Sequence, residues 1–291
     1  MTSPRIISFG EVLWDIFPDG EKFGGAPANF ACHAAILGAK VSMVTALGND
    51  RRGQLAINTL EGYGIDTELI QISPNTPTGI VQIELDAFGK PEFTIQPNSA
   101  WETVVWNSNL AECIPNADAV YFGTLGQHQE PARSTIHEAL DTAARSNVTR
   151  IVDINLRAPF FNKDTITHSI MRANLLKLSD EELPHVCKAF NITPQNSPET
   201  CLQRIKSITG LEGIVMTCGA QGAILVSANG TVNQPGFPTE VKDTVGAGDS
   251  FAAAFLMGWL QGQPDDQILH RACAVAATTC SHWGAVPTLP D

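Results

Sequence analysis

The sequence predicts an α/β fold, in which a mostly parallel central sheet is covered by helices and a smaller β-sheet projects from it. Apolar runs such as 117–122 and 150–154 alternate with helical patterns, as expected for parallel strands buried on both faces. Glycine and polar motifs follow several of these runs, and open parallel sheets bind ligands at that edge. Residues 79–95 instead alternate apolar with polar side chains, which is typical of an antiparallel hairpin with one solvated face.

In the first half of the chain, apolar and β-branched runs mark the strands, and glycine or proline turns mark their ends. We expect a strand at 5–10, two short strands around the turn Pro18-Asp19-Gly20, helices at 28–39 and 51–63, a strand at 41–47 and the hairpin at 79–95. The two short strands and the hairpin, about 12–23 and 76–97, would form the small sheet. It could serve as a flap beside a site, as a dimer interface, or as both.

The second half of the chain repeats strand and helix without a linker, so we expect a single domain over 1–291. The expected strands are 117–122, 150–156, 175–178, 213–218 and 223–227, the last of which turns at Asn229-Gly230. The expected helices are 130–145, 247–260 and 265–280.

The composition narrows the possible functions. Of 291 residues, 43% are hydrophobic, and the net charge is −12. Such an acidic chain, without a Lys/Arg cluster, argues against binding to nucleic acid or to an anionic membrane. A phosphate ligand would therefore have to be bound locally, by backbone amides and a metal. Scattered cysteines without C-x-x-C, no segment resembling a signal peptide and no long apolar run predict a reduced, cytoplasmic protein whose cysteines and histidines are structural.

The most informative segment is Gly246-Ala247-Gly248-Asp249, where a glycine turn enters an apolar helix. Unpaired N–H groups at a helix start carry partial positive charge, and glycines let an anion approach them. A carboxylate beside that anion would repel it, unless its task is to accept a proton from a hydroxyl that attacks the anion. Spacing alone leaves a second interpretation open, in which Asp249 is an ordinary acid that stabilises the first turn of a helix.

A second glycine turn, Gly24-Gly25-Ala26-Pro27, places Asn29 in the first turn of the next helix. The Asn29 amide could point at a ligand, or it could be a surface or capping group. Asp15 precedes this turn, whereas Arg157 and Glu182 follow later strands. Taken alone, Arg157 could belong to a surface ion pair, and Glu182 could be a solvated residue at a helix start.

Several common sites are excluded by their motifs. The sequence contains no G-x-x-x-x-G-K-[ST], no H-E-x-x-H and no G-x-S-x-G. The dinucleotide-binding fingerprint also fails, because Phe251 stands where its third glycine would be.

Two motifs together resemble a known family. The run 243–249, D-T-V-G-A-G-D, and the run 24–29, G-G-A-P-A-N, are similar to the two signatures of the ribokinase (PfkB-type) carbohydrate kinases. The resemblance extends from about residue 6 to residue 288, and the run 10–15, G-E-V-L-W-D, is closest to the fructokinase branch. It implies a Rossmann-like, doubly wound, ribokinase-like α/β domain with a β lid. It also implies that the γ-phosphoryl group of ATP is transferred to a sugar hydroxyl.

The resemblance further implies a role for individual residues. Asp249 would be the general base, and the amides of Gly246, Ala247 and Gly248 would form an anion hole. The other implied positions are Asp15, Gly24, Gly25, Asn29 and Arg157 for the sugar, Thr217, Gly219 and Gly222 for the nucleotide, Glu182 for the Mg²⁺-phosphate region, and Asp243 with the Val245 carbonyl for a monovalent cation such as K⁺.

Two departures from the family pattern bear on the metal and on the sugar. Ser179 stands where many members have the Asn of N-x-x-E, and Gln96 stands where fructokinases often carry an Arg. A neutral ketose, D-fructose, is the expected acceptor. Ribose, a nucleoside and 2-keto-3-deoxygluconate are alternatives, as is a non-catalytic sugar-binding regulator on the same fold. Open strand edges in the lid would suit a homodimer.

Overall fold

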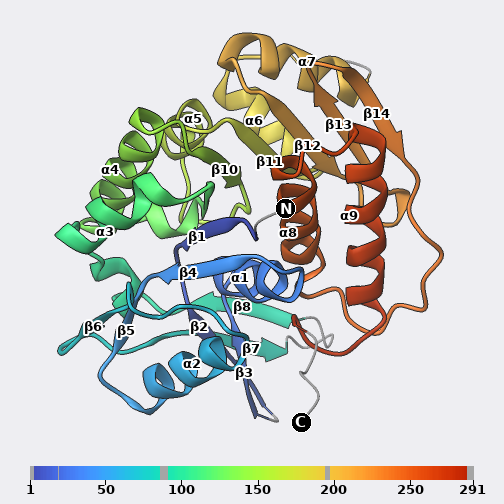
Figure 1. Ribbon diagram of the computed structural model, residues 1–291. Helices are drawn as coiled ribbons and strands as arrows, with labels where there is room; N and C mark the ends of the chain where they lie inside the picture. The colour runs from blue at the N-terminus through green and yellow to red at the C-terminus, as the bar shows by residue number, and fades with distance from the viewer. Residues whose placement is uncertain (1–2, 19, 86–90, 194–196, 287–291) are drawn as a thin grey trace.

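The computed structural model describes residues 3–18, 20–85, 91–193 and 197–286. Its central feature is an eight-stranded sheet with the order β14-β13-β12-β11-β10-β9-β1-β4 (Figure 1). The strands are β1 (Arg5–Phe9), β4 (Lys40–Val44), β9 (Ala119–Gly123), β10 (Thr149–Asp153), β11 (Leu175–Ser179), β12 (Gly213–Thr217), β13 (Ala223–Ser227) and β14 (Gly230–Gln234). In this sheet, β4, β1, β9, β10, β11 and β12 pair in parallel, each with the next. Strands β13 and β14 add an antiparallel edge beyond β12.

Helices cover both faces of this sheet, because its strands are apolar on both sides. Along β9, Tyr121 packs into one buried cluster and Phe122 into the other. One face carries α3 (Ser108–Cys113), α4 (Ala132–Arg145), α5 (Lys163–Met171), α6 (Leu183–Ala189) and α7 (Pro198–Thr209). The other carries α1 (Ala26–Ile36), α2 (Arg51–Gly62), α8 (Ala247–Leu260) and α9 (Asp265–Cys280). The predicted α/β fold with a mostly parallel sheet is confirmed.

A small second sheet stands apart from the main one, at the bottom of Figure 1. Its order is β3-β2-β7-β8, with β2 (Leu13–Phe17), β3 (Gly20–Gly24), β7 (Gly79–Leu85) and β8 (Pro91–Ile95). Leu13, Val81 and Ile83 form its own buried cluster, so the alternation in the sequence did mark a sheet with one apolar face. The expected turn at Phe88-Gly89 lies outside the described residues.

One expected strand is divided between two sheets. The run 41–47 was expected to form a single strand, but it leaves the main sheet after Val44. Residues Ala46–Gly48 form β5, which pairs in parallel with β6 (Gln71–Ser73). The buried Thr45 lies at the break, where its carbonyl accepts the N–H of Gln71. Periodicity could not locate this break, because all of 43–47 is buried and apolar apart from Thr45.

Candidate active site

The two glycine turns singled out in the sequence meet at one point of the fold. Each begins a helix without a side-chain cap, because its N-cap residue is a glycine with positive φ: Gly25 (103°) for α1 and Gly246 (78°) for α8. Asn29 Nδ2 donates a hydrogen bond to Asp249 Oδ2 at 2.9 Å. Residues 220 positions apart are thus brought together at the carboxyl-end edge of the sheet, where ligands of such folds bind.

The predicted acceptor residues cluster around the start of α1. A methyl group added at Gly24 would lie 2.7 Å from Asp15 Oδ2, and one added at Gly25 would lie 2.5 Å from the Glu11 carbonyl oxygen. Glycine is therefore required at Gly25, where φ is positive and the contact is with backbone, whereas at Gly24 the Asp15 side chain could move aside. Asn29 is buried, and its Oδ1 has no hydrogen-bond partner among the described residues. An unpaired buried acceptor is costly unless a ligand satisfies it.

The predicted nucleotide residues line a cavity of about 580 Å³ on the other side of Asp249. Thr217 ends β12, and Gly219 and Gly222 follow it. Ala247 and Gly248 of the α8 start line the same cavity. Apolar side chains complete it, among them Phe237, Val241, Phe251, Cys273 and Ala276. An apolar slot that ends at helix N-terminal amides suits a ligand with a flat ring and an anionic end.

Burial raises the pKa of each carboxyl group in this region. It raises the pKa of Glu11 to about 7 and that of Asp15 to about 6, and the positive charge of Arg157 opposes both shifts. Burial also raises the pKa of Asp249, against the hydrogen bond from Asn29 and the charges of Lys177 and Arg157. Arg157 itself is exposed, but its charge acts on all three carboxyl groups, so it faces the predicted acceptor corner.

Three buried charged residues of this region were not assigned from the sequence. Glu11 follows β1, and its Oε2 has no hydrogen-bond partner among the described residues. Lys177 and Asp153 form a buried ion pair at 2.9 Å beneath the start of α8. The available signal was a charged residue inside or just after an otherwise apolar run, since burying such a side chain is expensive unless it is paired. The expectation that backbone amides and a metal would bind a phosphate here stays a prediction, and Lys177 is a further buried charge close to that place.

The residues expected to hold metal ions are already engaged with backbone groups. Glu182 accepts from the N–H of Leu156 through Oε1 (2.7 Å) and from the N–H of Ser179 through Oε2 (2.8 Å). Asp243 accepts from the N–H groups of Val245 and Gly284, both at 3.0 Å. Within the described ranges, no group of three or more His, Cys, Asp or Glu side chains is arranged to hold a metal. These residues do not form a resident metal cage, and the cation roles of Glu182, Asp243 and Val245 stay predictions.

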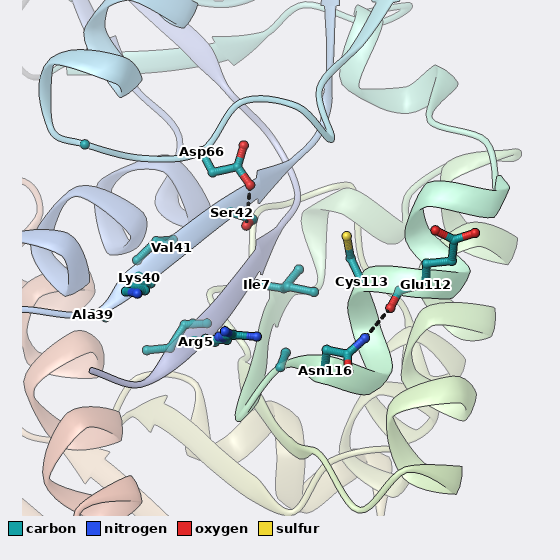
Figure 2. Close-up of a pocket in the computed structure, with 13 residues that line it drawn as sticks. Arg5, Ile7, Ala39, Lys40, Val41, Ser42, Asp66, Glu112, Cys113 and Asn116 are labelled. Atoms are coloured by element: carbon teal, nitrogen blue, oxygen red, sulfur yellow. Dashed lines mark hydrogen bonds between the residues drawn. The ribbon is translucent and has the colours of Figure 1, made fainter. Parts of the chain in front are cut away.

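A larger cavity of about 730 Å³ lies at the opposite edge of the sheet, and Figure 2 shows its lining. It is formed at the amino ends of β1 and β4, around Arg5 and Lys40, and by Glu112, Cys113 and Asn116 at the end of α3 and beyond. It contains none of the residues singled out in the sequence. A large volume is not by itself evidence of a binding or catalytic site. The smaller cavity, which reaches the α8 start, is the candidate active site.

Proteins of known class share this fold along nearly the whole chain. Probable fructokinase-5 of Arabidopsis thaliana is 28% identical over 315 residues, which cover 99% of this chain and 95% of that protein. An uncharacterized sugar kinase from Pyrococcus horikoshii, solved in complex with ATP, is 27% identical with a TM-score of 0.81, covering 96% of this chain and 93% of that one. A fructokinase double mutant from Vibrio cholerae, solved with fructose, ADP and potassium, is 24% identical with a TM-score of 0.83, covering 98% and 94%. The class of protein is that of the sugar kinases.

The family follows from a direct match. Residues 8–291 match the pfkB family carbohydrate kinases, and the chain belongs to that family. The resemblance carried by the runs 24–29 and 243–249 is therefore confirmed. None of the helices in the described part of the chain is long and apolar enough to cross a membrane.

Proposed function

We propose that this sugar kinase transfers the γ-phosphoryl group of ATP to a hydroxyl of a free hexose, D-fructose in the first instance. The observation that carries the proposal is the hydrogen bond between Asn29 and Asp249. It joins an acceptor corner, which has an unpaired buried amide oxygen, to a nucleotide-sized cavity that ends at the α8 amides. A hydroxyl bound by Asn29 would lie beside the carboxylate that must take its proton.

In the proposed reaction, Asp249 accepts the proton of the sugar hydroxyl as its oxygen attacks the γ-phosphorus. The bond from the γ-phosphorus to the β,γ-bridging oxygen breaks, and ADP leaves with the electron pair. Negative charge on the transferring group is met by the amides of Gly246, Ala247 and Gly248, which are fixed dipoles and need no reorganisation. Little else is demanded of the protein, because phosphoryl transfer depends mainly on alignment and charge stabilisation.

The phosphoryl donor is proposed to be MgATP, with Mg²⁺ brought by the nucleotide. Mg²⁺ keeps several of its waters and is commonly bound through substrate phosphates with few carboxylates, which agrees with the backbone-engaged Glu182. Activation by K⁺ at Asp243 and the Val245 carbonyl stays part of the proposal. Titrating K⁺ against turnover would test it.

Fructose is favoured by the fructokinase relatives and by the low positive charge of the acceptor corner. Arg157 acts on Asp15 and Asp249, Lys22 acts on Asp15 as well, and Gln96, which follows β8, is neutral and exposed. A phosphorylated or acidic sugar would need more positive charge than this. Asp15, Gly24, Gly25, Asn29 and Arg157 are proposed to contact the sugar.

The second sheet is proposed to act as a lid that excludes water, which would otherwise compete with the sugar as acceptor. Its β2 strand carries Asp15, so closing the sheet over the site would bring this carboxylate onto the sugar. Phe93 on β8 is 63% exposed, and a second copy of the chain could cover it. A homodimer through the lid is part of the proposal, and sedimentation velocity would test it.

A panel of acceptors in an ADP-release assay tests the proposed function. The panel contains D-fructose, D-glucose, ribose, a nucleoside, 2-keto-3-deoxygluconate and a control with no sugar. Turnover with fructose well above the sugar-free rate is the expected result. Turnover with a different acceptor alone would overturn the fructose assignment, and no acceptor-stimulated turnover would favour the non-catalytic regulator.

A further inference from the structure

The buried ion pair of Lys177 and Asp153 is the strongest feature of the site that the proposed reaction does not use. The two residues are direct partners in the parallel register of β10 and β11. Lys177 Nζ donates to Asp153 Oδ1 at 3.0 Å and to Oδ2 at 2.9 Å, and the two side chains are only 8% and 1% exposed. The Tyr121 hydroxyl donates to Asp153 Oδ2 at 3.3 Å, which fixes the carboxylate from β9.

The ammonium group of this pair lies directly beneath the first turn of α8. A methyl group added at Gly248 would sit 3.1 Å from Lys177 Nζ, so Gly248 leaves space for the cation. Gly248 is a predicted anion-hole residue, and the next residue is Asp249. The pair therefore lies against both the proposed base and the proposed anion hole.

A contribution to folding stability does not explain why the ion pair lies at this position. A cation near a helix N-terminus opposes the positive end of the helix dipole, where an acidic side chain would be preferred. A buried ion pair is also weak support for stability, because well-packed apolar residues of similar volume often do as well or better. A positive charge kept at this point is better explained by what it does to the neighbouring anions.

We propose that Lys177, held by Asp153, is a positioning residue that keeps Asp249 ionised and adds positive charge behind the α8 amides. The inference rests on the proposed function of Asp249 as the base. A base must be ionised in the free enzyme, yet burial favours its protonated form. Lys177 offsets that penalty from inside the protein, where salt screens it little.

The other groups that act on Asp249 come from every element packed around it. They are Asn29 from α1, Glu11 after β1, Tyr121 on β9, Asp153 on β10 and Arg157 after β10. Glu11 and Asp153 oppose ionisation of Asp249, and burial keeps Tyr121 neutral by raising its pKa. Arg157 favours ionisation but is exposed, so Lys177 is the buried cation among these groups.

Two variants test the proposal; they differ at position 177, where one has a lysine whose cationic form Glu182 and Asp249 still favour and the other has an uncharged methionine. Asp153→Asn keeps the lysine, whereas Asp153→Asn combined with Lys177→Met replaces the pair by a neutral one of similar volume. The acidic limb of kcat/KM against pH reports the base in the free enzyme. We expect this limb in the double variant to lie ~1 pH unit above that of Asp153→Asn, a shift typical of losing one nearby opposite charge. Coincident limbs would overturn the proposal and leave the pair a purely structural role.

A second readout does not depend on turnover. The carboxyl carbon of Asp249 can be followed by NMR in protein labelled with ¹³C-aspartate, with its resonance assigned through Asp249→Asn. The pKa of Asp249 should be higher in the double variant than in Asp153→Asn. If no sugar supports turnover, the proposed function fails, but this measurement still decides whether Lys177 controls the charge of Asp249. Urea unfolding of both variants confirms that the folded states being compared are intact.

Discussion

Helices α1 and α8 begin in the same way, but different charged groups lie around their first turns. Each follows a glycine turn, each lacks a side-chain cap and each is largely buried. At α1, the carboxyl group of Glu11 receives hydrogen bonding from the Ala26 backbone, and Pro27 lacks an N–H. At α8, Lys177 lies against Gly248. The α1 start thus has the Glu11 acid beside it and no cation in contact, whereas the α8 start has Asp249 in its first turn and the Lys177 cation beneath it.

This difference in the surrounding charges would let two similar glycine turns bind two different groups. A neutralised helix start with a side-chain amide suits uncharged hydroxyl groups. A helix start with free amides and a buried lysine suits a phosphoryl group that develops negative charge. Asn29 and Asp249 join the two at 2.9 Å, so acceptor and donor sites would share one boundary. Substitutions at Asp249, Glu11 and Asn29 would each alter the acceptor side or the donor side separately.

The largest effect is expected from Asp249→Asn. The variant keeps the size of the side chain and removes the proton acceptor, so kcat should fall by at least about 10²-fold, the lower range for a lost general base. Steady-state kinetics with saturating sugar and ATP measures it. ATP affinity from calorimetry should stay close to that of the unaltered protein, since the nucleotide cavity is untouched. Near-normal turnover in this variant would exclude Asp249 as the base.

The pH dependence of stability in Glu11→Gln tests whether the Glu11 carboxyl group beside α1 is penalised by burial. The pKa of Glu11 is about 7 in the folded protein against an ordinary value of 4.5, so the folded state binds this proton more tightly than the unfolded state does. Stability of the unaltered protein is therefore lost as pH rises from about 4.5 to about 7. Gln stays neutral, so the variant should come close to the unaltered protein at pH 4, below the unfolded pKa, and exceed it at pH 8 by up to about 3 kcal/mol.

Urea unfolding at both pH values measures this difference. Asp15 and Asp153 also have raised pKa values, but they are present in both proteins and cancel in the comparison. A variant that is less stable than the unaltered protein at pH 8 would contradict a carboxylate penalised by burial. It would instead make Glu11 an anion that the fold needs.

A smaller effect is expected from Asn29→Ala. Loss of one hydrogen-bonding group should raise KM for the sugar by about tenfold and KM for ATP by much less. Asn58→Ala on the exposed face of α2 is a matched control and should leave both constants unchanged. Equal increases for sugar and ATP would place Asn29 outside the acceptor site.

The sequence located the ends of α8 correctly, because a glycine turn and an unbroken apolar run define a helix without help from the rest of the fold. The predicted range 247–260 matches the helix Ala247–Leu260. The helices α5, α6 and α7 were not predicted, and neither was β14. Of these, α5, α6 and β14 are short, and none of the four has a glycine turn that leads into an unbroken apolar run.

The candidate site was predictable only where single segments carry its chemistry. Asn29 and Asp249 stood out through their glycine turns, and a family resemblance implied that both serve the same site, but not that their side chains touch. The pair of Lys177 and Asp153 depends on which strands are neighbours and in what register, which no local pattern records. The burial of Glu11 likewise depends on the α1 start that packs against it, which is not visible in the local sequence.

The most direct test of the account is a crystal structure of the protein with D-fructose and ADP. The account predicts density for the sugar between Asn29 and Asp249, with one hydroxyl within hydrogen-bonding distance of the Asp249 carboxylate and ADP in the cavity that ends at Gly248. Sugar bound elsewhere, for example in the cavity around Arg5 and Lys40, with the Asn29–Asp249 contact left closed, would contradict it.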